Sequence, residues 1–399
     1  MCITPGLLQR TIFDHPIIST FNPYSKAIFA RLKHCRTAAI GMHRYSCDQS
    51  NCDHTHWQYH SCGNRHCPSC GSWKKEEWIE HKTADLLPTA YYHVVFTLPH
   101  ELNTLIMGHR TCMFKLLFEA SAHTLLTLGK DPNHLGAEVG FTAILHTWGQ
   151  TLSFHPHLHC IVSGGGVHDG RWIAEKRKNR KFLFPRGSMR KIFKGFFMEH
   201  LRKLHRKNTF DLSDAAFNSL LNAIGYKKWN VYAKKPFGGP QQVVEYLGRY
   251  THKVAITHHR ILSIDDRKVC FRYKDYHDQN KTKELPLSQE DFVRRFEQHL
   301  LPKGFVKIRS YGFMKHHRKT QRINEVRATL NLAPAPPKVR IPVRHRMLEK
   351  YGKDIARCEK CGKGTMVLRE TIRVRYQPHK FVYETFTMYT HTQPDGYPP

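Results

Sequence analysis

The chain has 399 residues, with 63 Lys and Arg against 32 Asp and Glu, and its formal net charge is +31. A positive surplus of that size indicates a polyanionic partner, most simply nucleic acid, because the summed charge attracts phosphate. No apolar run approaches the roughly 20 residues that cross a bilayer, and the first residues lack the pattern of a secretory signal. We therefore expect a cytoplasmic protein with no membrane partner, whose 12 cysteines are thiols or metal ligands rather than disulfides.

Residues 1–40 are basic and are expected to be helical, and a dense group of cysteines follows them. Within it, Cys47-x4-Cys52 and Cys67-x2-Cys70 have the spacing of two ligand pairs on separate knuckles, and four thiolates make a tetrahedral zinc site. The spacing predicts one structural Zn²⁺ held by these four cysteines; the alternative is a set of reduced structural thiols. The spare donors that could replace one ligand or join a second ion are Cys62, His54, His56 and His66.

A strand is predicted from Ala90 and a long amphipathic helix from "TCMFKLLFEASAHTLLTLGK", and the stretch "SFHPHLHCIVSGGG" comes next. Side chains alternate between the faces of a strand, so His157 and His159 should share one face while Leu158 and Cys160 share the other. We expect Pro156 to mark the start of this strand and "SGGG" to end it in a flexible turn. Two imidazoles at i and i+2 can share one divalent cation, whereas the alternative is a basic, solvated strand face.

A basic insertion from about Arg171 to Phe210 leads to "QQVVEYLGRYTHKVAITHHR", which holds Tyr246 and Tyr250. The flanking apolar spacing predicts a helix, and residues i and i+4 lie on one helix face, here close to Arg249 and Lys253. A tyrosine can attack a phosphodiester and form a covalent intermediate while nearby cations stabilise the added charge. The alternative is a pair of packed aromatic residues.

Strands are predicted in "RILSIDDRKVCFRYKDY", followed by a helix with Ser288 as N-cap. The central part of the chain is therefore expected to be α+β. The proline-rich "NLAPAPPKVRIP" should act as a linker that sets off the C-terminal tail. In that tail Cys358 and Cys361 form half of a zinc site, with His379 or His391 as candidate partners.

Together these motifs resemble the two-tyrosine rolling-circle transposases of the insertion sequence 91 family, within the HUH endonuclease superfamily. The resemblance is carried by "SCGNRHCPSCG", "HTWGQTLSFHPHLHCIVSGGGV", "YLGRYTHKVAI" and "LPKGFVKIRSYGF", over roughly residues 30–320. It implies an α+β nuclease domain whose antiparallel sheet is flanked by helices, with the histidine pair on a central strand and the tyrosine helix packed against it. The expected divisions are a helical basic segment (1–40), a zinc-binding domain (41–82), the HUH domain (83–318) and a basic tail (319–399).

The resemblance also implies roles for individual residues. His157 and His159 would bind a catalytic Mg²⁺ or Mn²⁺, with Gln150 as our choice of third ligand and His146 as runner-up. Tyr246 and Tyr250 would be nucleophiles that nick and join single-stranded DNA at transposon ends and target through a 5′-phosphotyrosine intermediate. Arg249 and Lys253 would contact DNA, and the resemblance also implies a bacterial protein that is associated with the nucleoid.

The sequence contains no G-x-x-x-x-G-K-[ST] phosphate loop, so DNA unwinding is expected from a host helicase. Two alternatives stand beside the transposase reading. One is a plasmid-type replication initiator or relaxase that uses the same chemistry. The other is a non-catalytic, zinc-dependent DNA-binding protein, which accounts for the charge and the cysteines but not for the histidine and tyrosine pairs.

Overall fold

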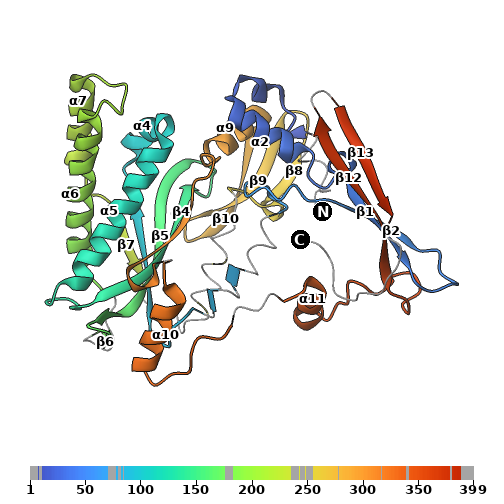
Figure 1. Cartoon of the computed structure of the whole chain (residues 1–399). Helices are drawn as coiled ribbons and strands as arrows, with labels where there is room; N and C mark the ends of the chain where they lie inside the picture. The colour runs from blue at the N-terminus through green and yellow to red at the C-terminus, as the bar shows by residue number, and fades with distance from the viewer. Residues whose placement is uncertain are drawn as a thin grey trace.

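The computed structural model describes residues 8, 11–70, 78–79, 82–83, 85–175, 183–234, 242, 248, 255–276, 278–315, 317–337, 341–377 and 380–387, without the side chains of 375–387. Its described elements form three antiparallel sheets accompanied by α-helices, as Figure 1 shows. The α+β class predicted from the sequence is confirmed. Among these described residues, no helix combines the length and the apolar character that crossing a membrane requires.

The central sheet has the strand order β11-β4-β5-β3-β7, and a short strand, β6, pairs with β5. The histidine-bearing strand β5 therefore lies in the middle of the sheet, with β4 on one side and β3 on the other, as expected. The bounds of these strands are β3 (Tyr91–Thr97), β4 (Glu138–Trp148), β5 (Phe154–His168), β6 (Arg171–Ala174), β7 (Val231–Lys234) and β11 (Ile308–Tyr311).

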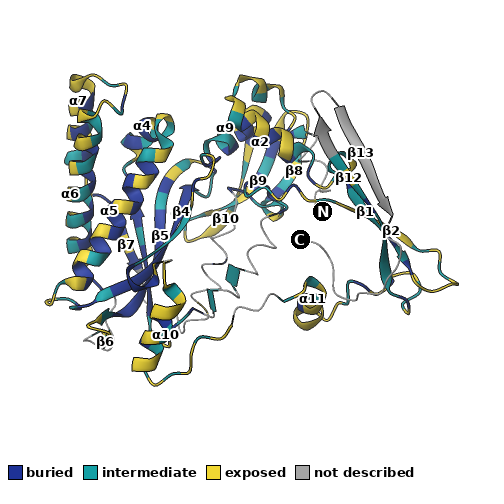
Figure 2. Ribbon diagram, viewed as in Figure 1, coloured by how far each residue is buried: buried dark blue, intermediate teal, exposed yellow. Residues whose placement is uncertain are grey.

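Helices cover one face of this sheet (Figure 1). Leu158, Cys160 and Val162 of β5 are completely buried in the core on that face, together with rings such as Phe118 and Phe193. Burying one such side chain contributes roughly 1.5–3 kcal/mol, and Figure 2 shows nearly continuous burial along β4 and β5, whereas buried and exposed residues alternate along α5. The helices are α4 (Asn103–Gly108), α5 (Arg110–Lys130), α6 (Arg186–Arg206) and α7 (Asp214–Gly225), and the 3-10 turn η3 (His100–Leu102) precedes α4.

The opposite face of the sheet holds a smaller apolar cluster that includes Tyr91, Ile144 and Ile161. It packs beneath η5 (Gly312–Met314) and α10 (Lys319–Thr329). Because Ile161 belongs to the same face as His157 and His159, this cluster lies beside the histidines on β5.

The prediction that "SGGG" ends the strand in a flexible turn is wrong, because β5 continues through these residues to His168. A Cβ atom added at Gly165 would overlap the indole ring of Trp172 on β6. One added at Gly164 would lie 2.8 Å from the carbonyl oxygen of Ala90. The glycines therefore permit close packing of neighbouring chain segments, because a residue without a side chain leaves room for another backbone or ring to approach a strand.

A second, three-stranded sheet has the order β10-β9-β8 and packs with α9 and the N-terminal helix α2 in a separate apolar core. Ser288 caps α9, since its hydroxyl accepts a hydrogen bond of 3.0 Å from the backbone N–H of Asp291, as predicted. The bounds are η1 (Pro16–Thr20), α2 (Pro23–Lys33), η2 (Ala38–Ile40), η4 (His258–Arg260), β8 (Ile261–Ile264), β9 (Lys268–Asp275), β10 (Lys281–Ser288) and α9 (Gln289–Gln298).

The third sheet, of order β13-β12-β1-β2, joins the two ends of the chain. β12 from the expected C-terminal tail pairs antiparallel with β1, so red and blue strands lie together in Figure 1. Residues 331–337 of the proline-rich stretch form neither helix nor strand. The elements are β1 (Met42–Cys47), β2 (Thr55–Tyr59), α11 (Val343–Tyr351), β12 (Met366–Gln377) and β13 (Lys380–Thr387).

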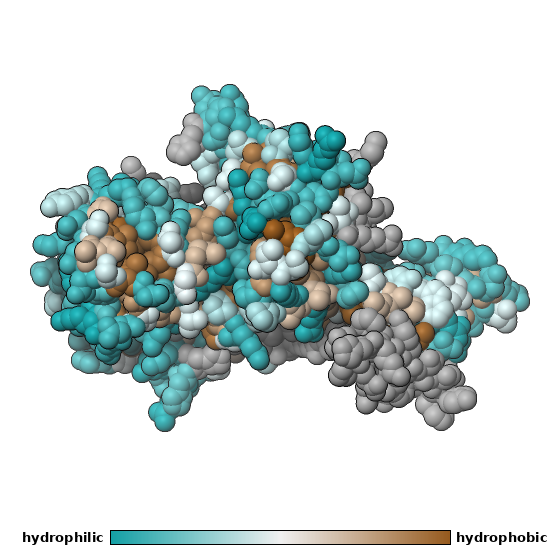
Figure 3. All heavy atoms as spheres, turned by 90° about the horizontal axis from the view of Figure 1, so that it is seen from above, coloured by the Kyte–Doolittle hydropathy of each residue, from teal (hydrophilic) through white to brown (hydrophobic). Residues whose placement is uncertain are grey.

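The surface in this view is mostly polar. Seen from above, most side chains are hydrophilic, and smaller apolar areas lie between them (Figure 3).

Candidate functional site

Three histidines from two neighbouring strands meet on the face of the central sheet opposite the helices. We call His146 of β4 and His157 and His159 of β5 the histidine cluster; their ligand atoms all lie within 4.8 Å of one another. The Nε2 atoms of His157 and His159 are 3.1 Å apart. His146 joins them because it pairs with His157 in the β4–β5 register, and directly opposed residues project from the same face of a sheet.

Gln150, the predicted third ligand, lies elsewhere. The β4–β5 register shifts between His146 and Trp148, and Gln150 falls in the turn beyond the end of β4. Its amide nitrogen donates to the hydroxyl of Tyr276 at 3.0 Å, and its oxygen accepts from the backbone N–H of Lys274 at 3.4 Å. Gln150 therefore connects the turn to the second sheet, and the geometry favours the runner-up, His146, as third donor.

The surroundings of the cluster keep the imidazoles of His157 and His159 neutral, the form that binds metal ions. Burial lowers the pKa of His157 to about 4. Burial also lowers the pKa of His159 well below its ordinary value, and the neighbouring His146 and His157 add to that effect.

Two further contacts orient the rings. The Nδ1 of His157 lies 2.6 Å from the carbonyl oxygen of His155, so Nδ1 carries the proton and Nε2 is left with its lone pair. The Nδ1 of His159 lies 2.8 Å from Nε2 of His93, a buried residue of β3. Such outer contacts fix the tautomer and direction of a ligand. The sequence analysis missed His93; its only signal was a histidine in the otherwise apolar "YYHVVF".

The four residues predicted on the tyrosine helix, Tyr246, Arg249, Tyr250 and Lys253, lie outside the described residues. Their roles stay predictions.

The cysteines form two clusters instead of the single predicted site. The first, the N-terminal cysteine cluster, contains Cys35, Cys62, Cys67 and Cys70, all buried. Sγ of Cys35 lies 3.5 Å from those of both Cys67 and Cys70, and Sγ of Cys62 lies 3.7 Å from that of Cys70. Zn–S bonds of about 2.3 Å in a tetrahedron place neighbouring sulfurs about 3.8 Å apart, so these positions fit zinc.

The second, the long-range cysteine cluster, contains Cys47, Cys52, Cys358 and Cys361. The predicted set of Cys47, Cys52, Cys67 and Cys70 is therefore corrected: its two halves belong to different clusters. The β1–β2 hairpin, which pairs with β12, contains Cys47 and leads to Cys52. The chain then comes back to the end of α2, so Cys67 and Cys70 lie beside Cys35, which follows that helix.

The remaining predicted donors divide in the same way. Cys62, predicted as a spare donor, is a member of the N-terminal cluster, whereas His66 belongs to neither cluster. Cys35 was missed because it lies apart from the dense group of thiols. His379 and His391, the candidate partners of Cys358 and Cys361, lie outside the described residues.

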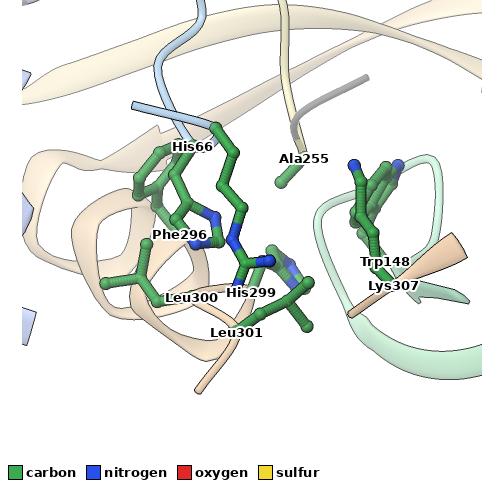
Figure 4. Close-up of a pocket in the computed structure, with 9 residues that line it drawn as sticks. His66, Trp148, Ala255, Phe296, His299, Leu300, Leu301 and Lys307 are labelled. Atoms are coloured by element: carbon green, nitrogen blue, oxygen red, sulfur yellow. The ribbon is translucent and has the colours of Figure 1, made fainter. Parts of the chain in front are cut away.

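His66 instead lines a small pocket where the cysteine-rich segment, the end of β4 and α9 meet (Figure 4). Burial lowers the pKa of His66 to about 3 and that of Lys307 to about 8. The cavity of about 20 Å³ has room for a single water molecule, which excludes it as a nucleotide site. Its lining residues are Arg65, His66, Trp148, Ala255, Phe296, His299, Leu300, Leu301 and Lys307.

Comparison with protein families gives two matches. Residues 140–322 match a family described as "Putative transposase", and residues 9–98 match one described as "Transposase zinc-binding domain". The first range contains the histidine cluster and the second contains the N-terminal cysteine cluster, whereas Cys358 and Cys361 lie beyond both.

Two curated relatives resemble most of the chain. It is 41% identical over 375 residues to "Putative transposase y4qJ" of Sinorhizobium fredii, in an alignment that covers 90% of this chain and 91% of the relative. It is 28% identical over 337 residues to "Transposase for insertion sequence element IS801" of Pseudomonas savastanoi pv. phaseolicola, in an alignment that covers 82% of this chain and 79% of that relative. No solved structure matches the chain.

Proposed function

Because this chain belongs to the insertion sequence 91 family of transposases and so acts on DNA, we propose that it nicks and joins single-stranded DNA through a covalent 5′-phosphotyrosine intermediate. The observation that carries the proposal is the histidine cluster, three imidazoles gathered on the central strands of an antiparallel sheet. A surface role alone gives no reason to gather three imidazoles side by side with His146 and His159 buried, because burying polar groups costs free energy.

His146, His157 and His159 would hold a divalent ion, Mg²⁺ or Mn²⁺, and their spacing fits such a role. When bound there, the ion would polarise the scissile phosphate as a Lewis acid. His93 and the carbonyl group of His155 position the rings that face the phosphate. Neutrality of the rings near pH 7 follows from their lowered pKa values.

Tyr246 and Tyr250 are the proposed nucleophiles. A tyrosine oxygen attacks the phosphorus, a new P–O bond to tyrosine forms, and the bond to the 3′ oxygen breaks. The phenolic proton leaves the tyrosine, the departing strand ends in a 3′-hydroxyl, and the 5′-phosphate stays on the protein. The second tyrosine would cut the target or the far end of the element, while Arg249 and Lys253 stabilise the added charge.

The zinc-binding domain belongs to the same proposal as an architectural part. We assign its ion to Cys35, Cys62, Cys67 and Cys70, which fill all four positions of a tetrahedron and leave none open for chemistry. Since the sequence lacks a phosphate loop, a host helicase would supply the single strands.

The test is a cleavage assay with purified full-length protein, labelled single strands from the DNA flanking its gene, and Mg²⁺ or Mn²⁺. We expect a protein–DNA adduct that survives a denaturing gel and is absent from the Tyr246→Phe, Tyr250→Phe double variant. Tyr226→Phe is the matched control, because Tyr226 is 92% exposed and should leave the adduct unchanged.

Two other outcomes would redirect the proposal. If the protein binds these strands but forms no adduct with either ion, it is a non-catalytic DNA-binding protein. If adducts form only on a plasmid origin sequence, the same chemistry serves replication initiation.

A further inference from the structure

The long-range cysteine cluster brings together two parts of the chain that are far apart in sequence. Sγ of Cys47 lies 3.7 Å from that of Cys361, at a separation of 314 residues. Sγ of Cys52 lies 3.8 Å from that of Cys358, at a separation of 306 residues. A disulfide would place its sulfurs about 2.05 Å apart, whereas tetrahedral zinc ligands lie about 3.8 Å apart. The spacing is therefore that of ligands around one ion.

The backbone around Cys358 and Cys361 is shaped for this arrangement. The N–H of Gly362 donates to the carbonyl oxygen of Cys358 at 2.9 Å, and the N–H of Gly364 donates to Sγ of Cys361 at 3.3 Å. Gly362 has φ of +65°, which favours glycine, and a Cβ at position 364 would overlap Sγ of Cys47. The sequence "CEKCGKG" thus turns tightly, stabilises a thiolate and leaves space for the opposing cysteine.

Contacts outside the thiols hold the two turns against each other. The backbone N–H of Asp48 donates to the carbonyl oxygen of Thr365 at 3.0 Å, and the N–H of Thr365 donates to the carboxylate of Asp48 at 2.8 Å. Arg44 of β1 makes two hydrogen bonds, of 2.7 and 3.1 Å, to the carboxylate of Glu370 on β12. The four sulfurs therefore converge on a prearranged frame.

The β1–β2 hairpin, whose residues are all described, contributes few buried apolar side chains to this frame. Every residue of β2 is exposed, and Trp57 and Tyr59 retain 42% and 43% of their accessible surface. Within the described part of β1, Tyr45 and Cys47 are the buried residues. A hairpin with so little buried apolar surface needs another source of folding free energy, and a structural metal ion is a common one.

We propose that Cys47, Cys52, Cys358 and Cys361 bind a second structural Zn²⁺, which fastens the C-terminal segment 341–377 to the β1–β2 hairpin. Four thiolates favour zinc among the common divalent ions of cells and leave no open coordination position. Neither family match reaches Cys358 or Cys361. This proposal is independent of the nuclease chemistry.

The first test is the zinc content of the purified full-length protein, measured by mass spectrometry of the metal. We expect two zinc ions per chain in the natural protein and one in the Cys358→Ser, Cys361→Ser variant. The Cys112→Ser, Cys270→Ser variant is the control and should keep two, because these thiols belong to neither cluster. Equal zinc content in the natural protein and in the Cys358→Ser, Cys361→Ser variant would overturn the proposal, whatever the N-terminal cysteine cluster binds.

X-ray absorption at the zinc edge on the natural protein avoids any folding defect of a variant. We expect two ions per chain with four sulfur neighbours each at about 2.3 Å. A nitrogen or oxygen contribution large enough to show that one of the two ions has ligands other than cysteine would contradict the assignment.

A second test addresses the fastening itself. A protease site placed in the full-length chain after Ala333, within the stretch that forms neither helix nor strand, allows the chain to be cut there. We expect the cut natural protein to elute as one species on gel filtration and the cut Cys358→Ser, Cys361→Ser variant to release its C-terminal fragment. Equal retention or equal release in both would show that zinc does not fasten this segment.

Discussion

Leu158 and His159 are neighbours on β5, yet they serve opposite faces of the central sheet. Leu158 is fully buried among aliphatic and aromatic side chains beneath the helices. His159 is also buried, but among three other histidines. Apolar burial around Leu158 stabilises the folded protein, whereas burial of the polar ring of His159 costs part of that stability. One strand therefore presents apolar core residues on one face and a candidate metal site on the other, at a spacing of one residue.

The largest effect should come from the histidine face. We expect His157→Ala to lower single-strand cleavage by about 100-fold or more, because the site loses a ligand for the ion that supports the reaction. Affinity for the same DNA should change little, since Lys and Arg contacts to phosphate supply most of it. Gel cleavage and fluorescence anisotropy measure the two quantities.

His168→Ala is the matched control for that variant, because His168 lies on β5 with a side chain that is 63% exposed. It should change neither quantity. A collapse of DNA affinity together with cleavage in His157→Ala would mean that the histidines maintain the structure of the DNA-binding surface instead.

The next effect should come from the helix-covered face. Leu158→Ala should lower the free energy of unfolding by about 2–5 kcal/mol, since it leaves a cavity in a close-packed core. Cleavage per folded molecule at low temperature should be retained. Leu348→Ala, at a position that is 51% exposed, should change stability by less than about 0.5 kcal/mol. Equal unfolding midpoints for the two variants would refute the division between the faces.

The smallest effect, counted per pH unit, concerns stability in buffer without added divalent ions. His157 has a folded pKa of about 4, below the ordinary 6.5, and the pKa of His159 is lowered too. Between those pH values the unfolded chain binds more protons, so stability should fall as the pH drops from 6.5 toward 4. Each such group contributes up to about 1.4 kcal/mol per pH unit.

Thermal unfolding midpoints across this pH range provide the measurement. The His157→Ala, His159→Ala variant should show a shallower loss than the natural protein, whereas Leu158→Ala should keep the natural slope. Other buried histidines such as His299, whose pKa burial also lowers to about 4, give a background common to all three proteins. Identical slopes in all three would show that the histidine face does not titrate in this range.

The alternation of His157 and Leu158 was predictable because it follows from a period of two residues. The placement of Gly164 and Gly165 inside β5 was not, since a glycine run normally indicates a turn and only the approach of Ala90 and Trp172 explains it. Gln150 failed as a third ligand for a related reason. A register shift at the end of β4, which the sequence does not reveal, carries it away from His157.

The cysteines also show that sequence spacing predicts local arrangements better than contacts between distant parts of the chain. Spacing identified each local pair of thiols, since ligand pairs on a knuckle are close in sequence. It could not identify which pairs share an ion, because that depends on the pairing of β1 with β12 and on the return of the chain to Cys35. The tyrosine pair, Tyr246 and Tyr250, stays a prediction.

The pairing of β1 with β12 also sets an order of events during synthesis. Arg44 and the Glu370 carboxylate that it binds are 326 residues apart. At about 5–20 residues per second, a ribosome needs on the order of tens of seconds to deliver that partner. For this interval the β1–β2 hairpin has an unpaired edge, and edges of that kind readily pair with other chains. A copy of the gene cut short before β12 would leave that edge open for good.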